Sequence, residues 1–87
     1  MERQEILEVV RTHLVEELDV EPDEVAETTN FREDLEADSL DLYTLLQELE
    51  DRFGMKLTDQ QAAEIETVGQ AIDAVEKYAT GDSEQGP

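Results

Sequence analysis

The fold is decided by residues 35–54, which read LEADSLDLYTLLQELEDRFG. Large apolar residues recur in this stretch at intervals of three and four positions, which is the spacing of one face of an amphipathic helix. The pattern predicts a helix from about Ser39 to Phe53, and Gly54 is a suitable residue to end it. The predicted apolar face consists of Leu42, Leu45, Leu46, Leu49 and Phe53.

A second helical pattern and a long connection precede this helix. Residues from Glu2 to about Leu18 predict a first helix, because apolar side chains recur at the same three- and four-residue spacing. Its predicted apolar stripe is Ile6, Leu7, Val10, Leu14, Val15 and Leu18. The pattern stops between Asp19 and Asp38, and a connection of this length is unusual in a compact domain unless it is anchored or functional. The residues expected to anchor it are Val20, Val25, Phe31 and Leu35.

Two more helix starts follow the central helix. Thr58 with Gln61, and Thr67 with Gln70, have the spacing of a capping box, in which each side chain bonds the backbone N–H of the other residue. The first box predicts a short third helix that runs to about Ile65, and the second box predicts a fourth helix. The apolar positions of the fourth helix are Val68, Ala71, Ile72, Val75, Tyr78 and Ala79.

No strand pattern competes with these four helices. We therefore expect an all-α fold: a four-helix bundle with a short third helix and a long loop between helices one and two. The folded domain is expected to span residues 1–79, and the polar residues 80–87 predict a disordered tail. A chain of 87 residues has room for one hydrophobic core, and nothing in the sequence predicts an oligomer, so we expect a monomer.

Acidity is the strongest feature of the composition. The chain has 25 Asp and Glu against 6 Lys and Arg, for a formal net charge of -19. Such a charge repels nucleic-acid phosphates and anionic membrane surfaces, so we expect neither as a partner and favour a protein with a basic patch. General solubility or adaptation to salt would also explain the acidity, and composition alone does not separate these explanations.

The composition also indicates a compartment. Cysteine is absent, which excludes disulfides, thiolate nucleophiles and thiolate metal ligands from this chain. No run of 18 apolar residues is present, and Met1 leads into charged residues rather than into a signal sequence. We therefore expect a cytoplasmic protein.

The sequence predicts neither catalytic residues nor a metal site. His13 is the only histidine, and it falls between stripe positions of the first helix, which predicts a surface residue rather than a general base. Carboxylates are so numerous that no pair stands out, and four short helices rarely form the cleft that a catalytic carboxylate pair needs. A calcium loop of the EF-hand type has Gly at its sixth position, whereas residues 19–36 contain no Gly.

Ser39 is the strongest candidate for chemistry. It follows the long connection and begins the central helix, within the run Asp38-Ser39-Leu40-Asp41. A helix cap alone would explain Asp38 or Ser39, because both residue types are preferred at helix N-termini. Its position after an anchored loop, in a small and very acidic chain, favours a functional serine.

The chain resembles the acyl carrier protein family over about residues 3–79. That family places a modified serine in an Asp-Ser-Leu motif at the start of its second helix, and Asp38-Ser39-Leu40 matches this motif. Further matches are Phe31, Asp34-Leu35, Phe53-Gly54, Lys56-Leu57, Thr67-Val68 and Ala71-Ile72. The resemblance implies a non-catalytic carrier for fatty-acid, specialised lipid or polyketide synthesis. It also implies a 4'-phosphopantetheine cofactor, which a phosphopantetheinyl transferase would join covalently to Ser39.

The resemblance further implies how the carrier is used. Acyl groups would be carried as thioesters on the arm and presented to synthase and acyltransferase enzymes with basic docking patches. Asp38 and Leu40 are expected beside the cofactor. Our hypothesis is that Asp38 and Asp41 contact the modifying enzyme or its metal. The expected docking surface consists of Leu40, Asp41, Tyr43, Thr44, Gln47, Glu48 and Asp51. The residues expected to line a space for the acyl chain are Leu46, Leu49, Ile65 and Ile72.

Three positions depart from common fatty-acid carriers and leave the pathway open. Glu36 stands where those carriers have Gly, Thr44 where they have an acidic residue, and Gln47 where they have an apolar one. A peptidyl or aminoacyl carrier is one alternative, although residues 36–39 lack the Gly-Gly pair that is typical of such carriers. The other alternative is an unmodified acidic helical interaction protein.

Overall fold

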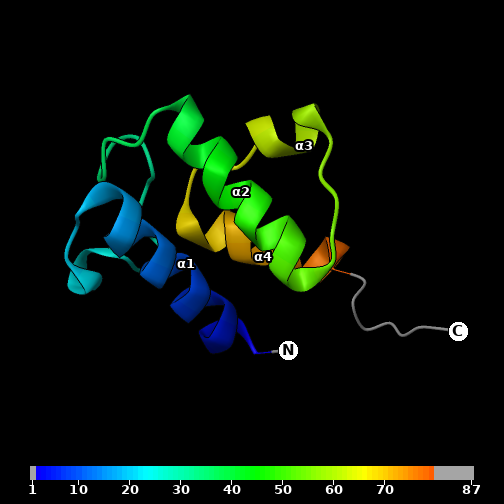
Figure 1. The fold of residues 1–87 in the computed structure, drawn as a ribbon, viewed down its shortest axis with the longest axis horizontal. Coiled ribbons are helices and arrows are strands. Elements are labelled where there is room, and N and C mark those ends of the chain that lie inside the picture. The colour runs from blue at the N-terminus through cyan, green and yellow to red at the C-terminus, as the bar shows by residue number, and fades with distance from the viewer. Residues whose placement is uncertain (1, 80–87) are drawn as a thin grey trace, which may run out of the picture.

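The computed structural model describes residues 2–79. Figure 1 shows the elements in chain order: α1 (Arg3–Leu18), η1 (Pro22–Glu24), α2 (Ser39–Phe53), α3 (Asp59–Ala63) and α4 (Val68–Tyr78). This confirms the predicted all-α arrangement with a short third helix and a long loop after the first helix. The tail predicted for residues 80–87 lies outside the described residues. Within residues 2–79, no helix is long and apolar enough to cross a membrane.

Capping residues set the helix boundaries. Thr58 and Thr67 each accept a hydrogen bond from the backbone N–H three residues later, and Gln61 and Gln70 complete the two predicted capping boxes. α2 begins and ends at the predicted residues, and Gly54 follows it with a φ of 65°, in the left-handed region that glycine adopts without strain.

α3 ends at Ala63, two residues before the predicted end. The N–H groups of Glu64 and Ile65 each donate to the carbonyl three residues earlier, at 3.2 Å, which makes a tighter turn than an α-helix. This turn directs Ile65 into the core, where only 7% of the residue is exposed. The helix therefore ends early, and the tighter turn allows Ile65 to be buried.

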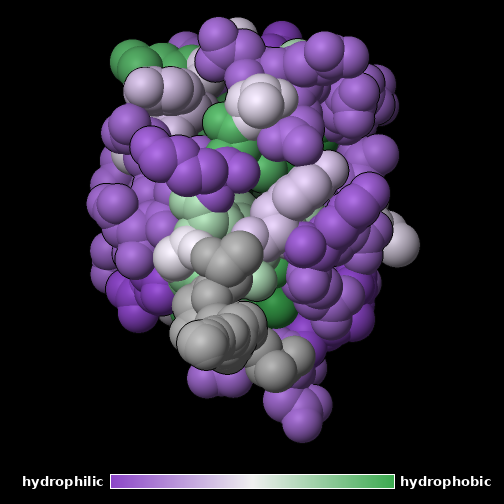
Figure 2. All heavy atoms as spheres, turned by 90° about the vertical axis from the view of Figure 1, so that its right-hand side faces the viewer, coloured by the Kyte–Doolittle hydropathy of each residue, from purple (hydrophilic) through white to green (hydrophobic). Residues whose placement is uncertain are grey.

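The core lies where α1, α2 and α4 pack together. In Figure 1, α1 and α2 run in roughly opposite directions. The predicted apolar face of α2 is buried as expected. The fully buried residues of the three helices include Ile6, Val10, Leu14, Leu45, Leu49, Val68, Ile72 and Val75. On the face that Figure 2 shows, hydrophilic side chains cover most of the surface, and hydrophobic ones reach it between them.

The apolar stripe of α1 differs from the prediction at two positions. Val9 packs against the core, whereas Val15 is not among the side chains that do so. A helix turns by about 100° per residue, so Val15 points to the opposite side from Ile6 even though it is only one residue from Leu14. The angular position of a residue around the helix axis therefore predicts core contact better than its distance in sequence from the nearest apolar residue.

The long connection is anchored, as predicted. Val25, Phe31 and Leu35 are buried, and Val20 is partly buried against the core. The Phe31 N–H donates to the carbonyl of Glu66 at 3.0 Å. The neighbouring residue Asn30 pairs with Thr67 in an isolated antiparallel bridge. These contacts hold the end of the connection against the start of α4, and they fix the backbone that leads into α2.

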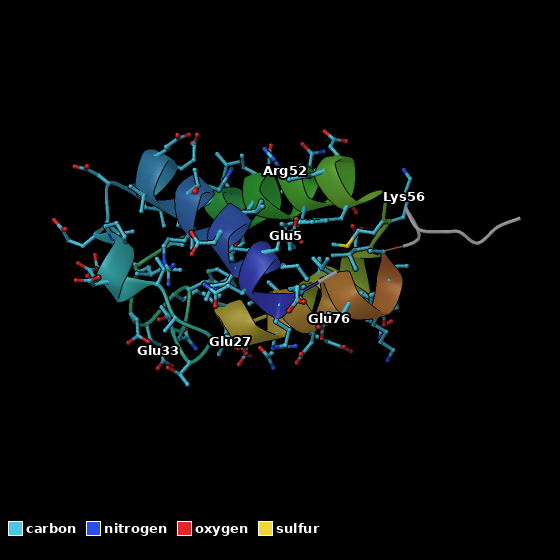
Figure 3. All side chains as sticks on the ribbon, turned by 90° about the horizontal axis from the view of Figure 1, so that it is seen from below. Glu5, Glu27, Glu33, Arg52, Lys56 and Glu76 are labelled. Atoms are coloured by element: carbon cyan, nitrogen blue, oxygen red, sulfur yellow. The ribbon has the colours of Figure 1, made fainter. Side chains whose placement is uncertain are left out.

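Arg3 joins the start of α1 to the connection and to α4. Its guanidinium contacts Glu27 at 2.6 Å, and Asp73 and Glu76 at 2.7 Å each. Figure 3 shows Glu27 and Glu76 reaching the first turn of α1 from the connection and from α4. The hydrogen bond from Arg3 lowers the pKa of the Glu27 carboxyl, against the opposing effect of partial burial, and Glu27 in turn raises the pKa of Arg3.

Candidate functional site

The site is built on the first turn of α2. Asp38 is the N-cap: its Oδ1 accepts a hydrogen bond from the Asp41 N–H at 3.0 Å, and Asp41 Oδ2 accepts one from the Asp38 N–H at 3.1 Å. Ser39 is the first residue of the helix and is exposed. Of the two residues that could cap this helix, Asp38 does so, and the Ser39 hydroxyl takes no part in the cap.

The capping contacts keep the Asp38 carboxylate charged. The backbone N–H of Asp41 is the main cause that lowers the pKa of Asp38, and partial desolvation opposes it. The positive charge of Arg32 lowers this pKa further. A carboxylate and a guanidinium therefore both lie near the serine.

Arg32 contacts Ser39 directly, and sequence reasoning missed it. Its Nη2 donates a hydrogen bond to Ser39 Oγ at 3.0 Å. One signal in the sequence could have found it, because Arg32 is the only Lys or Arg in residues 12–51. The backbone of Arg32 is itself held, since its N–H donates to Asn30 Oδ1 at 2.9 Å and its carbonyl accepts from the Glu36 N–H at 3.1 Å.

This arrangement suits the attachment of a phosphate group. Ser39 offers an exposed primary hydroxyl at the N-terminus of a 15-residue helix. The positive end of a helix dipole and a neighbouring guanidinium both favour the negative charge of a phosphate. The residues present therefore fit a phosphopantetheine group that is joined to Ser39 as a phosphodiester.

The predicted docking surface is mostly exposed. Leu40 is 70% exposed and Tyr43 59%, and they are the two large hydrophobic residues that lie exposed in the described part of the chain. The other exposed members of the predicted surface are Thr44, Gln47 and Asp51. Neither side chain is covered by the rest of the fold, although the Tyr43 hydroxyl accepts a hydrogen bond from Gln47 Nε2 at 3.2 Å, and neighbouring exposed apolar groups of this kind are typical of an interaction surface.

Two members of the predicted surface are half-buried and have partners inside the chain. Asp41 belongs to the capping box, and Glu48 pairs with Arg52 at 3.0 Å. His13, which was predicted at the surface, is also half-buried, and its Nε2 has no hydrogen-bond partner among the described residues. No group of three or more His, Asp or Glu side chains in residues 2–79 is placed to hold a metal ion.

The four residues predicted to line a space for an acyl chain are packed in the core. Leu46, Leu49, Ile65 and Ile72 are each no more than 7% exposed. Beside them a groove of about 300 Å³ lies between the end of the connection, α2 and α3. Its lining includes Arg32, Leu42, Ala62, Ala63 and Ile65. Among the predicted residues, only Ile65 lines this groove.

Comparisons with known proteins identify the family of the chain. Residues 8–75 match the family model described as the phosphopantetheine attachment site. An acyl carrier protein of Rubrobacter xylanophilus is 46% identical over 80 residues, which cover 92% of this chain and 99% of that one. An acyl carrier protein of Lactobacillus acidophilus is 36% identical over 78 residues, which cover 90% and 98% of the two chains.

A solved structure shows the same fold. The acyl carrier protein from Enterococcus faecalis superposes with a TM-score of 0.73 at 40% sequence identity, covering 86% of this chain and 95% of that one. The chain therefore belongs to the acyl carrier protein family, whose members are non-catalytic carriers with 4'-phosphopantetheine as prosthetic group.

Proposed function

We propose that Ser39 carries the phosphopantetheine arm of this protein and that acyl groups travel on this arm as thioesters between enzymes. One observation carries the proposal: the Ser39 hydroxyl is exposed at the start of α2, while Asp38 makes the cap that a serine could otherwise have made. The hydroxyl is therefore oriented by a stable helix turn and remains accessible to a modifying enzyme.

The attachment needs only a hydroxyl from this chain. Ser39 Oγ forms a bond to the phosphorus of coenzyme A that bears pantetheine, and the pyrophosphate bond breaks. The nucleotide leaves with its remaining phosphates, and the serine proton passes to the phosphopantetheinyl transferase. The attached arm supplies a thiol that forms thioesters with acyl groups, in a chain that has no cysteine of its own.

Partner enzymes dock, in this proposal, on the exposed side of α2 next to Ser39. Leu40 and Tyr43 provide an apolar centre, and the acidic surface around them attracts a basic patch. Screening by salt acts over about 8 Å at physiological ionic strength, so association with a partner slows as salt rises. An association rate that does not depend on salt would contradict this docking mode.

The cargo and pathway also belong to the proposal. We place this carrier in the cytoplasm with synthase and acyltransferase enzymes of fatty-acid, specialised lipid or polyketide synthesis. The groove between α2 and α3 has apolar walls at Leu42, Ala62 and Ile65 and is a candidate to shelter an acyl chain. Thr44 and Gln47 lie exposed on the docking side, where they present neutral polar groups to a partner.

The test is intact mass spectrometry after incubation with coenzyme A and a broad-specificity phosphopantetheinyl transferase. We expect one increase in mass, equal to a single phosphopantetheine, in the natural chain and none in Ser39→Ala. An unchanged mass in the natural chain would support an unmodified interaction protein. Loading of the holo protein with amino acids rather than acyl groups would support a peptidyl carrier.

A further inference from the structure

Arg32 differs from the other arginines in what it contacts. Arg3, Arg11 and Arg52 each pair with a carboxylate at 2.6 to 3.0 Å. Among the described residues, Arg32 makes no such pair, and its guanidinium donates instead to the hydroxyl of Ser39 at 3.0 Å. The charge of Arg32 also acts on the nearby Asp38 carboxylate, but no carboxylate among the described residues takes up its donors, so they are available to another anion.

The position of Arg32 is fixed by its neighbours. Phe31 is fully buried, and its carbonyl accepts a hydrogen bond from the Ala37 N–H at 2.9 Å, which closes the turn that contains Arg32. Asn30 Oδ1 accepts from the N–H groups of both Arg32 and Glu33, at 2.9 Å each. The backbone is therefore held on both sides, and the contact with Ser39 orders only the side chain of Arg32.

We propose that Arg32 binds the phosphodiester of the arm attached to Ser39 and holds the start of the arm against the protein. This inference rests on the proposed function. A phosphorus atom bonded to Ser39 Oγ brings its two free oxygens close to a guanidinium that already contacts that oxygen. Arginine has a planar set of donors that matches two phosphate oxygens at once, and we expect the contact to be of this bidentate kind.

The carboxylates around Ser39 would repel a phosphodiester, so its contact with Arg32 matters for stability. Asp38 and Asp41 lie in the same helix turn and are held there by the capping box. A phosphodiester on Ser39 adds a negative charge beside them, and Arg32 is the cation whose side chain reaches this position. Arg32 also lines the groove between α2 and α3, so the same contact places the start of the arm at that groove.

The experiment compares apo and holo forms of the natural chain, Arg32→Gln and Arg32→Lys. Mass spectrometry first measures the loaded fraction, and only fully loaded protein is used further. The change in melting temperature on loading and the ³¹P resonance of the phosphodiester are then measured for each. In the natural chain we also record the guanidinium ¹H–¹⁵N resonances of Arg32 before and after loading.

We expect loading to shift the Arg32 guanidinium resonances in the natural chain. The change in melting temperature on loading should be a few degrees more negative for Arg32→Gln than for the natural chain. Arg32→Lys should lie between them, because lysine keeps the positive charge but lacks the planar pair of donors. The ³¹P resonance of holo Arg32→Gln should differ from that of the natural holo protein. Arg52→Gln is the matched control, since it removes the same charge about 20 Å from Ser39 along the axis of α2. It should respond to loading as the natural chain does.

The outcomes separate this inference from the proposed function. If the natural chain loads, but Arg32→Gln and Arg52→Gln respond to loading alike and the Arg32 resonances do not move, Arg32 does not bind the phosphate and the inference alone is overturned. If the natural chain fails to load, the proposed function is wrong, and the inference is overturned with it.

Discussion

Glu36 closes the connection directly before the site, in a conformation that suits glycine. Its φ is 59°, in the left-handed region. Its N–H donates to the Arg32 carbonyl at 3.1 Å, and the next residue, Ala37, donates to the Phe31 carbonyl at 2.9 Å. The bond from Glu36 to Arg32 is the single hydrogen bond of the αL motif, in which the left-handed position favours Gly. A residue with a Cβ in that position is disfavoured by about 1 kcal/mol or more.

Replacing Glu36 with glycine is therefore expected to stabilise the protein. Glu36→Gly should raise the free energy of unfolding by about 0.5–1 kcal/mol, because it relieves backbone strain at the expense of a more flexible unfolded chain. Thermal and urea unfolding of the apo protein would measure the change. Glu36→Ala is the control, since it removes the same charge and keeps the Cβ. A gain of the same size in both variants would show that charge, and not backbone conformation, is responsible.

Asp38 caps α2 and is proposed to contact the modifying enzyme, and two substitutions separate these roles. Asp38→Asn keeps an oxygen that accepts from the Asp41 N–H, whereas Asp38→Ala does not. We expect Asp38→Asn to melt close to the natural chain and Asp38→Ala to melt several degrees lower. If the charge contacts the modifying enzyme, both variants should load at least about tenfold more slowly in a transferase assay. Loading of Asp38→Asn at the natural rate would limit Asp38 to its capping role.

Close contact between α4 and the connection depends on Gly69. Its N–H donates to the Glu27 carbonyl at 2.8 Å, and a Cβ added to Gly69 would lie 2.9 Å from that same oxygen. The backbone oxygen cannot move away without losing the hydrogen bond. We expect Gly69→Ala to destabilise the fold by about 1–2 kcal/mol, despite the better helix propensity of alanine. Chemical denaturation measures this loss, and faster amide exchange at Val68, whose N–H donates to Thr29, would locate it. Unchanged stability would mean that α4 shifts freely against the connection.

The elements with a regular signal were predictable from the sequence. The spacing of leucines in α2 and the Thr-Gln capping boxes at the starts of α3 and α4 are local signals, so they were sufficient to predict these helices. Ser39 was predicted as the attachment site in the same way, through the residues around it. The contact from Arg32 was not found, because it depends on how a turn seven residues earlier folds back toward α2. The half-buried state of Glu48 likewise depends on packing and on its pairing with Arg52.

Across the whole molecule, contacts that are distant in sequence hold an acidic chain together. Arg3 is 24 residues from Glu27, 70 from Asp73 and 73 from Glu76, and its one side chain bonds all three. The start of α1, the connection and α4 therefore meet at a single cation. With a formal net charge of -19, the folded chain is under strong self-repulsion, so local neutralisation of this kind has a larger effect than in a balanced protein.

This arrangement gives stability a defined dependence on pH. The hydrogen bond from Arg3 lowers the pKa of Glu27 in the folded state below its value in the unfolded chain. The resulting stabilisation is complete above the ordinary glutamate pKa of about 4.3 and disappears as the pH falls through the lower pKa of the folded state.

Glu27→Gln should melt a few degrees below the natural chain at pH 7, and this difference in melting temperature should shrink steadily below about pH 4. Glu24→Gln, in the same connection, is the control: it removes an exposed carboxylate that makes no ion pair among the described residues, so it should not lower the melting temperature at pH 7. A Glu27→Gln deficit that stays constant from pH 7 to pH 3 would mean that the side-chain packing of Glu27, and not its charge, supports the junction.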